Sequence, residues 1–406
     1  MRVAFTVYRG NPRSGGQGVY TRYLTRELVR LGHDVTVLSG PPYPELDPGV
    51  ELRKLESLDL FGGELPFRPP SPFSFPDSVA FYEIALMLTG AFPDPKAFGV
   101  RLRRMTAEIE RGFDLVHDNQ SLNWAVADLA ARGMPSVASI HHPITVDRRL
   151  ALEAASSLKA RIGLRRFFSF LPMQAKVARR MSRVITVSQV SALDIAREMG
   201  IPHSRISVIP IGVDSEVFRP LPQVRREPGL ICTTASAAVP MKGLRYLLEA
   251  VKALPDTRLV IMGPHDDSSN VATLIERLGL AERVQLAGSV SLEEMVVTYA
   301  RSQVAVIPSL YEGFSLPAVE AMACGVPLVA SSGGALAEVV GGLAATVKPG
   351  SGGLLAIAIE EVLADYEAAL FRAEQARIEV LKRYSWERAA LLTEVEYTRA
   401  LAGSRG

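Results

Sequence analysis

The stretch 307-IPSLYEGFSLPAVEAMACGVPLVASSGG-334 decides how the second half of this chain folds. The apolar residues 304–307 predict a buried parallel strand, which Pro308 ends. Pro317 stands in the first turn of a predicted helix, and Gly325 is the expected stop of that helix. A second apolar run at 327–330 predicts the next strand. The stretch therefore reads as strand, loop, helix and strand of a parallel α/β sheet.

Two glutamates in this stretch occupy positions that suit ligand binding. Glu312 lies in the loop beyond the carboxyl end of a strand, where open α/β sheets bind their ligands, and Glu320 lies on the helix that follows. The backbone N–H groups at the start of that helix suit a phosphate. Both residues could be ordinary surface acids. The tightly specified turn 311-YEGFSLP-317 favours a functional role instead.

Length and composition limit the classes of protein to consider. The 406 residues fit two domains of roughly 150 to 200 residues, and 48% hydrophobic with 22% charged residues is typical of a globular protein. A net charge of +2 argues against a nucleic-acid partner. Cys232 and Cys324 lie in apolar segments, which excludes a disulfide scaffold and predicts a cytoplasmic protein. The chain opens on a strand and lacks an apolar run of roughly 18 residues, so we expect neither export nor membrane insertion.

The N-terminal segment predicts a strand, a glycine-rich loop and a helix. The strand covers 3–7, and the helix covers 19–31 and ends at Gly32. The loop glycines let backbone amides approach an anion; they are Gly15, Gly16 and Gly18. A dinucleotide-binding enzyme would need glycine where Thr21 stands and an acid after the second strand, so hydride transfer is disfavoured. A tight turn without a ligand remains the alternative.

Polar residues end two further predicted strands, at 114–117 and 136–140. His117 ends the first strand and Asn119 follows it, and His141 and His142 follow the second. A lone histidine is usually structural, but strand ends are where ligands collect. Between 41 and 100 there is little regular periodicity, apart from an amphipathic helix at 77–88. We expect this helix to face the core, with an acceptor-facing helix as the alternative.

A strongly basic segment covers residues 148–183, with Glu153 as its only acid. It fits a solvated helix face best, with a peripheral membrane contact or a site for an anionic acceptor as alternatives. Beyond 206, apolar strands alternate with helical patterns, which predicts a second parallel sheet. The sequence has no Asp-x-Asp triplet and no His/Cys cluster with metal-ligand spacing, so we expect no metal and no cofactor.

The segment 312-EGFSLPAVE-320 resembles the signature of family 4 glycosyltransferases, in which seven residues separate two glutamates. The resemblance implies the GT-B fold, that is, two Rossmann-like parallel-sheet domains facing across a cleft. It assigns 1–205 to the acceptor side and 206–380 to the donor side, with 381–406 returning to the first domain. The segment 236-SAAVPMKG-243 resembles the diphosphate loop of the family. Lys242 matches the family lysine, whereas Ala237 replaces the usual arginine.

The resemblance also implies retaining, metal-independent transfer of a sugar from a nucleotide-diphosphate sugar to an unidentified acceptor. The residues expected to be catalytic are His141, Glu312 and Lys242. Those expected to bind the donor are Gly15, Gly16, Gly18, Gly288, Val290, Gly313, Phe314, Ser315, Leu316 and Glu320. Those expected to contact the acceptor are His117, Asn119 and His142. A catalytically silent sugar-nucleotide binder and a GT-B phosphorylase are the alternatives.

Overall fold

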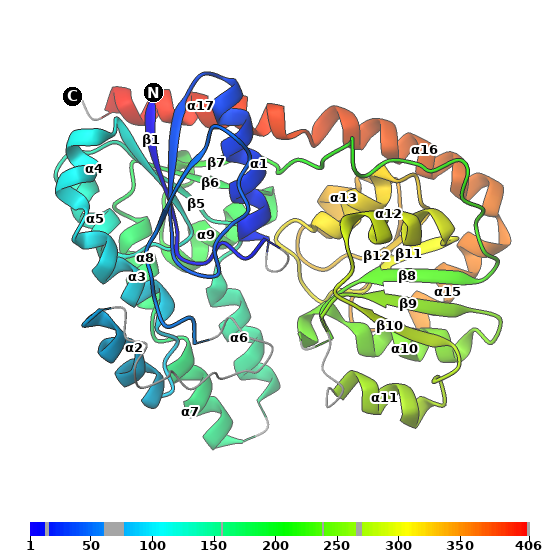
Figure 1. The fold of residues 1–406 in the computed structure, drawn as a ribbon. Helices are drawn as coiled ribbons and strands as arrows, with labels where there is room; N and C mark the ends of the chain where they lie inside the picture. The colour runs from blue at the N-terminus through cyan, green and yellow to red at the C-terminus, as the bar shows by residue number, and fades with distance from the viewer. Residues whose placement is uncertain (13–15, 61–76, 156, 238, 265–269, 404–406) are drawn as a thin grey trace. The chain divides into compact units, whose positions relative to one another are not determined.

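The structure is a computed structural model, and it describes residues 1–12, 16–60, 77–155, 157–237, 239–264 and 270–403. The chain forms two compact units (Figure 1). The first unit contains Met1–Val187, Ser191–Ile209 and Trp386–Gly406; the second contains Ser188–Val190 and Pro210–Ser385. In the described part of the chain, every helix is too short or too polar to span a lipid bilayer.

The described residues of the first unit form a seven-stranded parallel sheet in the order β3-β2-β1-β4-β5-β6-β7. The strands are β1 (Arg2–Val7), β2 (Asp34–Ser39), β3 (Glu51–Lys54), β4 (Leu115–Asn119), β5 (Ser136–Ser139), β6 (Arg183–Thr186) and β7 (Ile206–Val208). The central strands are buried over nearly their whole length, as expected when helices cover both faces of a parallel sheet. The direction of winding reverses between β1 and β4, which creates a switch point at the carboxyl edge.

Helices cover both faces of this sheet (Figure 1). The helices of the first unit are α1 (Gln17–Arg30), α2 (Val79–Leu88), α3 (Asp94–Arg103), α4 (Thr106–Gly112), α5 (Trp124–Ala131), α6 (Ile144–Ala154), α7 (Leu158–Phe167), α8 (Leu171–Ala178), α9 (Gln189–Met199), the short η1 (His203–Arg205) and the C-terminal α17 (Trp386–Gly403). Of these, α2, α6 and α7 extend away from the sheet (Figure 1). Helix α17 packs beside α1, where the rings of Trp386 and Tyr23 stack with centroids 5.4 Å apart. It is fastened to β6 by an ion pair of 2.7 Å between Arg183 Nε and Glu396 Oε2.

The described residues of the second unit form a six-stranded parallel sheet in the order β10-β9-β8-β11-β12-β13. The strands are β8 (Leu230–Thr234), β9 (Arg258–Met262), β10 (Val284–Gly288), β11 (Val304–Ile307), β12 (Leu328–Ser331) and β13 (Ala345–Val347). The helices are η2 (Pro240–Lys242), α10 (Leu244–Ala253), α11 (Asn270–Leu278), α12 (Leu292–Arg301), α13 (Leu316–Ala323), α14 (Leu336–Val340), α15 (Gly352–Ala364) and α16 (Tyr366–Arg383). The switch point of this sheet lies between β8 and β11.

The observed elements confirm the prediction of two parallel-sheet α/β units. The predicted strand 304–307 is β11, and the helix expected after Pro308 is α13. Gly325 lies just beyond α13 with φ +67°, the left-handed conformation that favours glycine after a helix. Helix α2 differs from the expectation, because it buries little: Phe81 and Leu88 are 64% and 78% exposed.

Candidate functional site

Lys242 and Glu312 form an ion pair at the switch point of the second sheet. Lys242 comes from the loop after β8 and Glu312 from the loop after β11, and these two strands are neighbours. Lys242 Nζ lies 2.8 Å from Glu312 Oε1, and Ser309 Oγ donates to the same oxygen at 2.6 Å. The glutamate side chain is 12% exposed and the lysine side chain 30%. The pair is therefore held in place on the glutamate side and open to solvent on the lysine side.

Glycines allow the loops at this switch point to pack backbone against backbone. Gly243 has φ +67°, and a Cβ there would lie 2.1 Å from the carbonyl oxygen of Pro308. Gly334, with φ +63°, forms an isolated β-bridge with Glu312, and a Cβ there would lie 2.2 Å from the Glu312 carbonyl oxygen. A larger residue at either position would push the loops apart. These contacts set the position of Glu312 relative to Lys242.

The predicted residues 313–316 form the turn that leads into α13. Ser315, the residue before the helix, has φ +92° although it is not glycine, and its buried Oγ has no hydrogen-bond partner among the described residues. Phe314 is buried against Tyr384, with ring centroids 5.3 Å apart. Strained backbone of this kind persists where the surroundings impose it, often at ligand sites. The N–H groups of Leu316 and Ala318, on either side of Pro317, have no intrahelical acceptors and suit an anion.

Glu320 lies on α13 with a carboxylate that has no hydrogen-bond or ion-pair partner among the described residues. Burial raises its pKa to about 7, because an apolar environment disfavours the charged form. The nearby Tyr299 hydroxyl is bonded to Thr234 Oγ1 at 2.9 Å. The Glu320 carboxylate is therefore available to accept hydrogen bonds from the hydroxyl groups of a ligand.

The position of the missing arginine is part of the protein core. Ala237 is buried in the apolar cluster of the second unit, and its N–H donates to the carbonyl of Pro264 at 3.1 Å. Arg245, which could replace the lost charge, is 68% exposed and pairs with Glu249 at 3.3 Å. Arg13, another possible substitute, lies outside the described residues.

Gly288 and Val290 lie at the other end of the carboxyl edge. Gly288 ends β10 with φ +72°, and its carbonyl accepts a hydrogen bond of 2.8 Å from the N–H of Gly263. Two strands, β9 and β8, separate β10 from β11. The predicted base-binding residues thus share the sheet edge with Lys242 and Glu312 but do not adjoin them.

In the first unit, Asn119 orients His141. His141 follows β5, and its Nε2 lies 2.8 Å from Asn119 Oδ1. The Asn119 amide nitrogen donates to Thr21 Oγ1 at 3.0 Å and to the Gln17 carbonyl at 3.2 Å. This leaves the amide oxygen to accept, so Nε2 of His141 carries the hydrogen. Nδ1 of His141 has no partner among the described residues and can accept a hydrogen bond from a ligand.

Burial sets the charge of His141 and the role of Asn119. Burial, reinforced by the nearby His142, lowers the pKa of His141 to about 3, so the ring is neutral at physiological pH. Asn119 is wholly buried, which suits positioning His141 rather than touching an acceptor. Its link to α1 crosses the β1/β4 switch point of the first sheet. The spacing of residues 119 and 141 along the chain carries no signal of this contact.

The other predicted histidines are already engaged. His117 is fully buried, with Nδ1 2.6 Å from the Tyr397 hydroxyl and Nε2 2.7 Å from Ser139 Oγ. Both ring nitrogens are occupied, and burial lowers its pKa to about 3, so the geometry favours a structural role. His142 Nε2 pairs with Asp147 Oδ2 at 2.9 Å on the half-exposed start of α6.

Two of the three predicted N-terminal loop glycines can be described, and Gly15 lies outside the described residues. Gly16 is the N-cap of α1 with φ +75°, and its carbonyl accepts from the N–H of Tyr20 at 2.9 Å. Gly18 is tightly enclosed, since a Cβ there would lie 2.1 Å from the carbonyl oxygen of Asn11. Only a glycine fits at position 18, so packing constrains at least this part of the loop.

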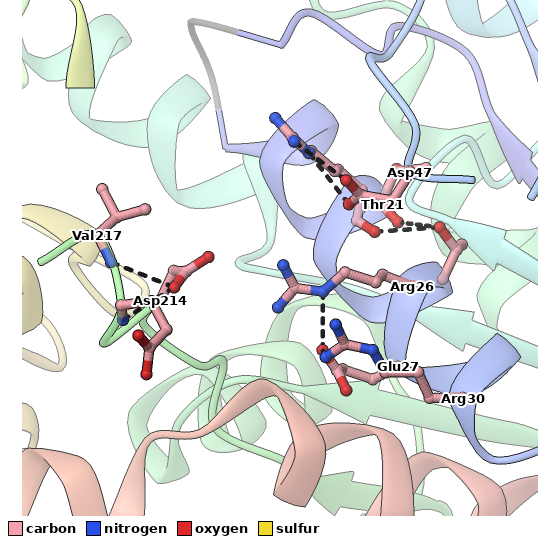
Figure 2. Close-up of polar contacts among 10 residues, drawn as sticks. Thr21, Arg26, Glu27, Arg30, Asp47, Asp214 and Val217 are labelled. Atoms are coloured by element: carbon pink, nitrogen blue, oxygen red, sulfur yellow. Dashed lines mark hydrogen bonds and ion pairs between the residues drawn. The ribbon is translucent and has the colours of Figure 1, made fainter. Parts of the chain in front are cut away.

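Helix α1 also carries polar contacts that the sequence reading missed. Figure 2 shows Arg26 and Arg30 directed at Glu27, whose Oε1 accepts from them at 2.8 and 2.9 Å. One turn earlier, Arg22 pairs with Asp47 at 3.1 Å. These arginines are spaced four residues apart in the sequence, which places them on one face of the helix and could have indicated a set of ion pairs there. All three arginines are paired with acids, and two of them share Glu27.

A second group of contacts in Figure 2 belongs to the second unit. There Asp214 Oδ1 accepts the N–H groups of Glu216 at 3.1 Å and Val217 at 3.4 Å. An aspartate that bonds the backbone two and three residues ahead stabilises a turn. Asp214 therefore has a structural role at the start of the second unit.

Across the described residues, no group of three or more His, Cys, Asp or Glu side chains could hold a metal ion.

Comparison with known proteins identifies the family. Residues 14–217 match the family model described as Glycosyltransferase Family 4, and residues 222–378 match Glycosyl transferases group 1. The chain is 41% identical, over 99% of both chains, to the MMP alpha-(1->4)-mannosyltransferase of Mycolicibacterium hassiacum. It is 28% identical to the D-inositol 3-phosphate glycosyltransferase of Mycolicibacterium smegmatis, over 98% of this chain and 89% of that one.

Solved structures agree on the fold. Sucrose-phosphate synthase (tll1590) from Thermosynechococcus elongatus superposes with a TM-score of 0.77 at 23% identity, over 99% of this chain and 100% of that one. Anabaena Alr3699/HepE in complex with UDP and glucose superposes with a TM-score of 0.72 at 18% identity, over 98% and 99%. The chain belongs to glycosyltransferase family 4, has the GT-B fold and is a hexosyltransferase-type glycosyltransferase.

Proposed function

We propose that this enzyme transfers a mannosyl group from a nucleoside-diphosphate sugar to a hydroxyl group of an acceptor, with retention of the anomeric configuration and without a metal ion. The observation that carries the proposal is the Lys242–Glu312 pair beside the start of α13 at the switch point. The identity of 41% to a mannosyltransferase over nearly the whole chain supports mannose as the sugar. The UDP named for the Anabaena structures supports a nucleotide donor.

Each residue of the second-unit site has a role in this reaction. Glu312 accepts hydrogen bonds from hydroxyl groups of the transferred sugar, and Glu320 accepts them from the ribose. Lys242 and the first N–H groups of α13 stabilise the charge that develops on the departing diphosphate. These groups supply the positive electrostatics that a metal ion supplies elsewhere, which is why we propose metal-independent transfer.

The transfer step follows from the position of the leaving group. The bond between C1 of the sugar and the phosphate oxygen breaks, and its electron pair stays on the diphosphate. The acceptor oxygen bonds to C1 on the same face, and its proton passes to the departing phosphate oxygen. The neutral ring of His141 in the first unit can accept a hydrogen bond from a sugar hydroxyl through Nδ1.

A catalytically silent sugar-nucleotide binder is the second candidate, and Ala237 is the observation that favours it. An enzyme with one cation at the diphosphate, where two are usual, stabilises the leaving group less.

The compartment we propose is the cytoplasm, since Cys232 and Cys324 are buried free thiols.

Release of nucleoside diphosphate tests the proposal. The purified chain is incubated with mannose and glucose donors of guanosine and uridine diphosphate, with and without mannoside acceptors and with and without EDTA. We expect acceptor-dependent release that EDTA leaves unchanged, an α-linked product by NMR, and a loss of at least tenfold in Glu312→Gln. Tight binding of a donor without transfer to any acceptor would instead establish the silent binder. Formation of a sugar 1-phosphate from a glycoside and inorganic phosphate, with no nucleotide required, would indicate a phosphorylase.

A further inference from the structure

A basic cavity of about 530 Å³ lies in the first unit among α6, α7 and α9. Helices α6 and α7 contact each other (Figure 1). The residues that line the cavity include Thr145, Arg148, Arg149, Arg161, Arg165 and Glu198. A volume of this size is typical of sites for small ligands. All of these residues belong to one unit, so the cavity is complete without the other.

Positive charge in the cavity exceeds negative charge. Four arginines line it, together with the two acids Glu153 and Glu198. Arg149 approaches Glu198 at 3.8 Å, whereas Arg148, Arg161 and Arg165 have no ion-pair partner among the described residues. This contrasts with α1, where each arginine of the helix face is paired. Like charges gathered in a concave surface attract an anion, and guanidinium groups bind phosphate or carboxylate in bidentate geometry.

Thr145 adds a buried hydroxyl to this charge. It is 8% exposed, lines the cavity, and its Oγ1 has no hydrogen-bond partner among the described residues. A buried polar group without a partner costs about 1–3 kcal/mol, so such groups are rare unless a ligand or water completes them. This hydroxyl and the four guanidinium groups that line the same cavity together form a donor set for an oxyanion.

The first lining residue of the cavity, Thr145, follows closely in the chain after the residue that we place at the sugar. Thr145 lies in the first turn of α6, four residues after His141 at the end of β5. From Thr145 to Leu152, α6 rises by roughly 10 Å, about the length of one hexose with a phosphate substituent. A ligand held by the arginines can therefore extend along α6 toward the strand ends.

We propose that this cavity binds the anionic group, phosphate or carboxylate, of a small acceptor molecule. This rests on the proposed transferase function, because it makes the cavity the acceptor-recognition site. The concave shape and the buried hydroxyl of Thr145 favour a discrete anion over a membrane surface. A membrane would instead use the exposed apolar side chains of α7, among them Leu158 and Ile162.

Binding of small anions to the whole enzyme tests the cavity independently of catalysis. Calorimetry measures Kd for inorganic phosphate, mannose 6-phosphate, gluconate and, as the uncharged probe, mannose. The variants are Arg148→Gln, Arg165→Gln and Thr145→Val, and the control is Arg111→Gln, which removes an exposed arginine from α4. We expect at least tenfold weaker binding of the anions in each arginine variant, at least threefold in Thr145→Val, and less than twofold in the control. Comparing phosphate with gluconate identifies the anion.

Separate readouts distinguish failure of this inference from failure of the proposed function. UDP affinity reports the second unit and should not change in these variants, and phosphate affinity should survive Lys242→Met. Where an acceptor is found, its KM should rise tenfold or more in Arg165→Gln with little change in kcat. The inference is overturned if the wild type binds none of the anions at millimolar concentration or if all variants bind them equally. Arginine-dependent binding to phosphatidylglycerol vesicles, without binding of small anions, would overturn it in favour of a membrane contact.

Discussion

Replacing Lys242 with methionine should greatly impair transfer, because this lysine is the one cation in the loop that we propose contacts the diphosphate. The segment 235–243 contains no other Lys or Arg, and Ala237 is buried where a second cation is usual. A hydrogen bond to a charged group is worth about 1.5–3 kcal/mol, which corresponds to roughly 10- to 150-fold in rate. Removing Lys242 also leaves Ser309 as the one side-chain partner of the Glu312 carboxylate among the described residues, in the site where we propose that the diphosphate binds. We therefore expect a loss of about 100-fold in kcat/KM.

The assay compares initial rates with a control that changes the same residue type in the same unit. Lys252 is exposed on α10, and Lys252→Met should keep kcat/KM within about twofold. The double variant Lys242→Met/Glu312→Gln should lose less than the product of the two single losses, because the unpaired carboxylate is gone. If folded Lys242→Met retains a third or more of wild-type kcat/KM, the lysine does not face the leaving group.

Three further predictions concern groups around the sites. Burial raises the pKa of Glu320 from 4.5 to about 7, so the unfolding free energy should fall as pH rises through this window, and Glu320→Gln should flatten that slope in urea titrations. Gly243→Ala should lower the unfolding free energy by at least about 1–2 kcal/mol through its left-handed backbone alone, whereas Gly353→Ala, with open space around it, should not lower it. Tyr397→Phe removes the hydroxyl bonded to His117 and should cost about 1–3 kcal/mol by thermal unfolding with kcat unchanged; a changed kcat would return His117 to the active site.

The parts of the fold that local patterns determine were predicted well. Strand β11, helix α13 and the Gly325 stop follow from an apolar run, a proline in a first turn and a glycine after a helix. These signals lie within a few residues of the elements they define. The same stretch places Glu312 at the carboxyl edge, because parallel strands share that edge. Its pairing with Lys242, 70 residues earlier in the chain, needed the order of the strands.

The parts that depend on distant contacts could not be read from the sequence. Helix α2 has a periodic pattern, but periodicity does not say what covers its apolar face, and Leu88 is exposed. His117 stands at a strand end like a ligand residue, yet its ring is bonded to Tyr397, 280 residues later. The orientation of His141 depends on Asn119, and that of Asn119 on α1. Each of these outcomes is set by tertiary packing.

The buried Ala237 connects the fold of the second unit to its chemistry. Its side chain belongs to the apolar core and its N–H is bonded to Pro264, so this part of the loop is fixed by packing rather than held ready for a phosphate. In the reaction that we propose, Lys242 and the start of α13 are the sources of positive electrostatics at the leaving group. Lys242 is held in place by Glu312, which the backbone contact with Gly334 positions in turn. Charge, strained backbone and glycine packing at this switch point therefore depend on one another. Loss of Lys242 cannot be offset by a second cation from the same loop.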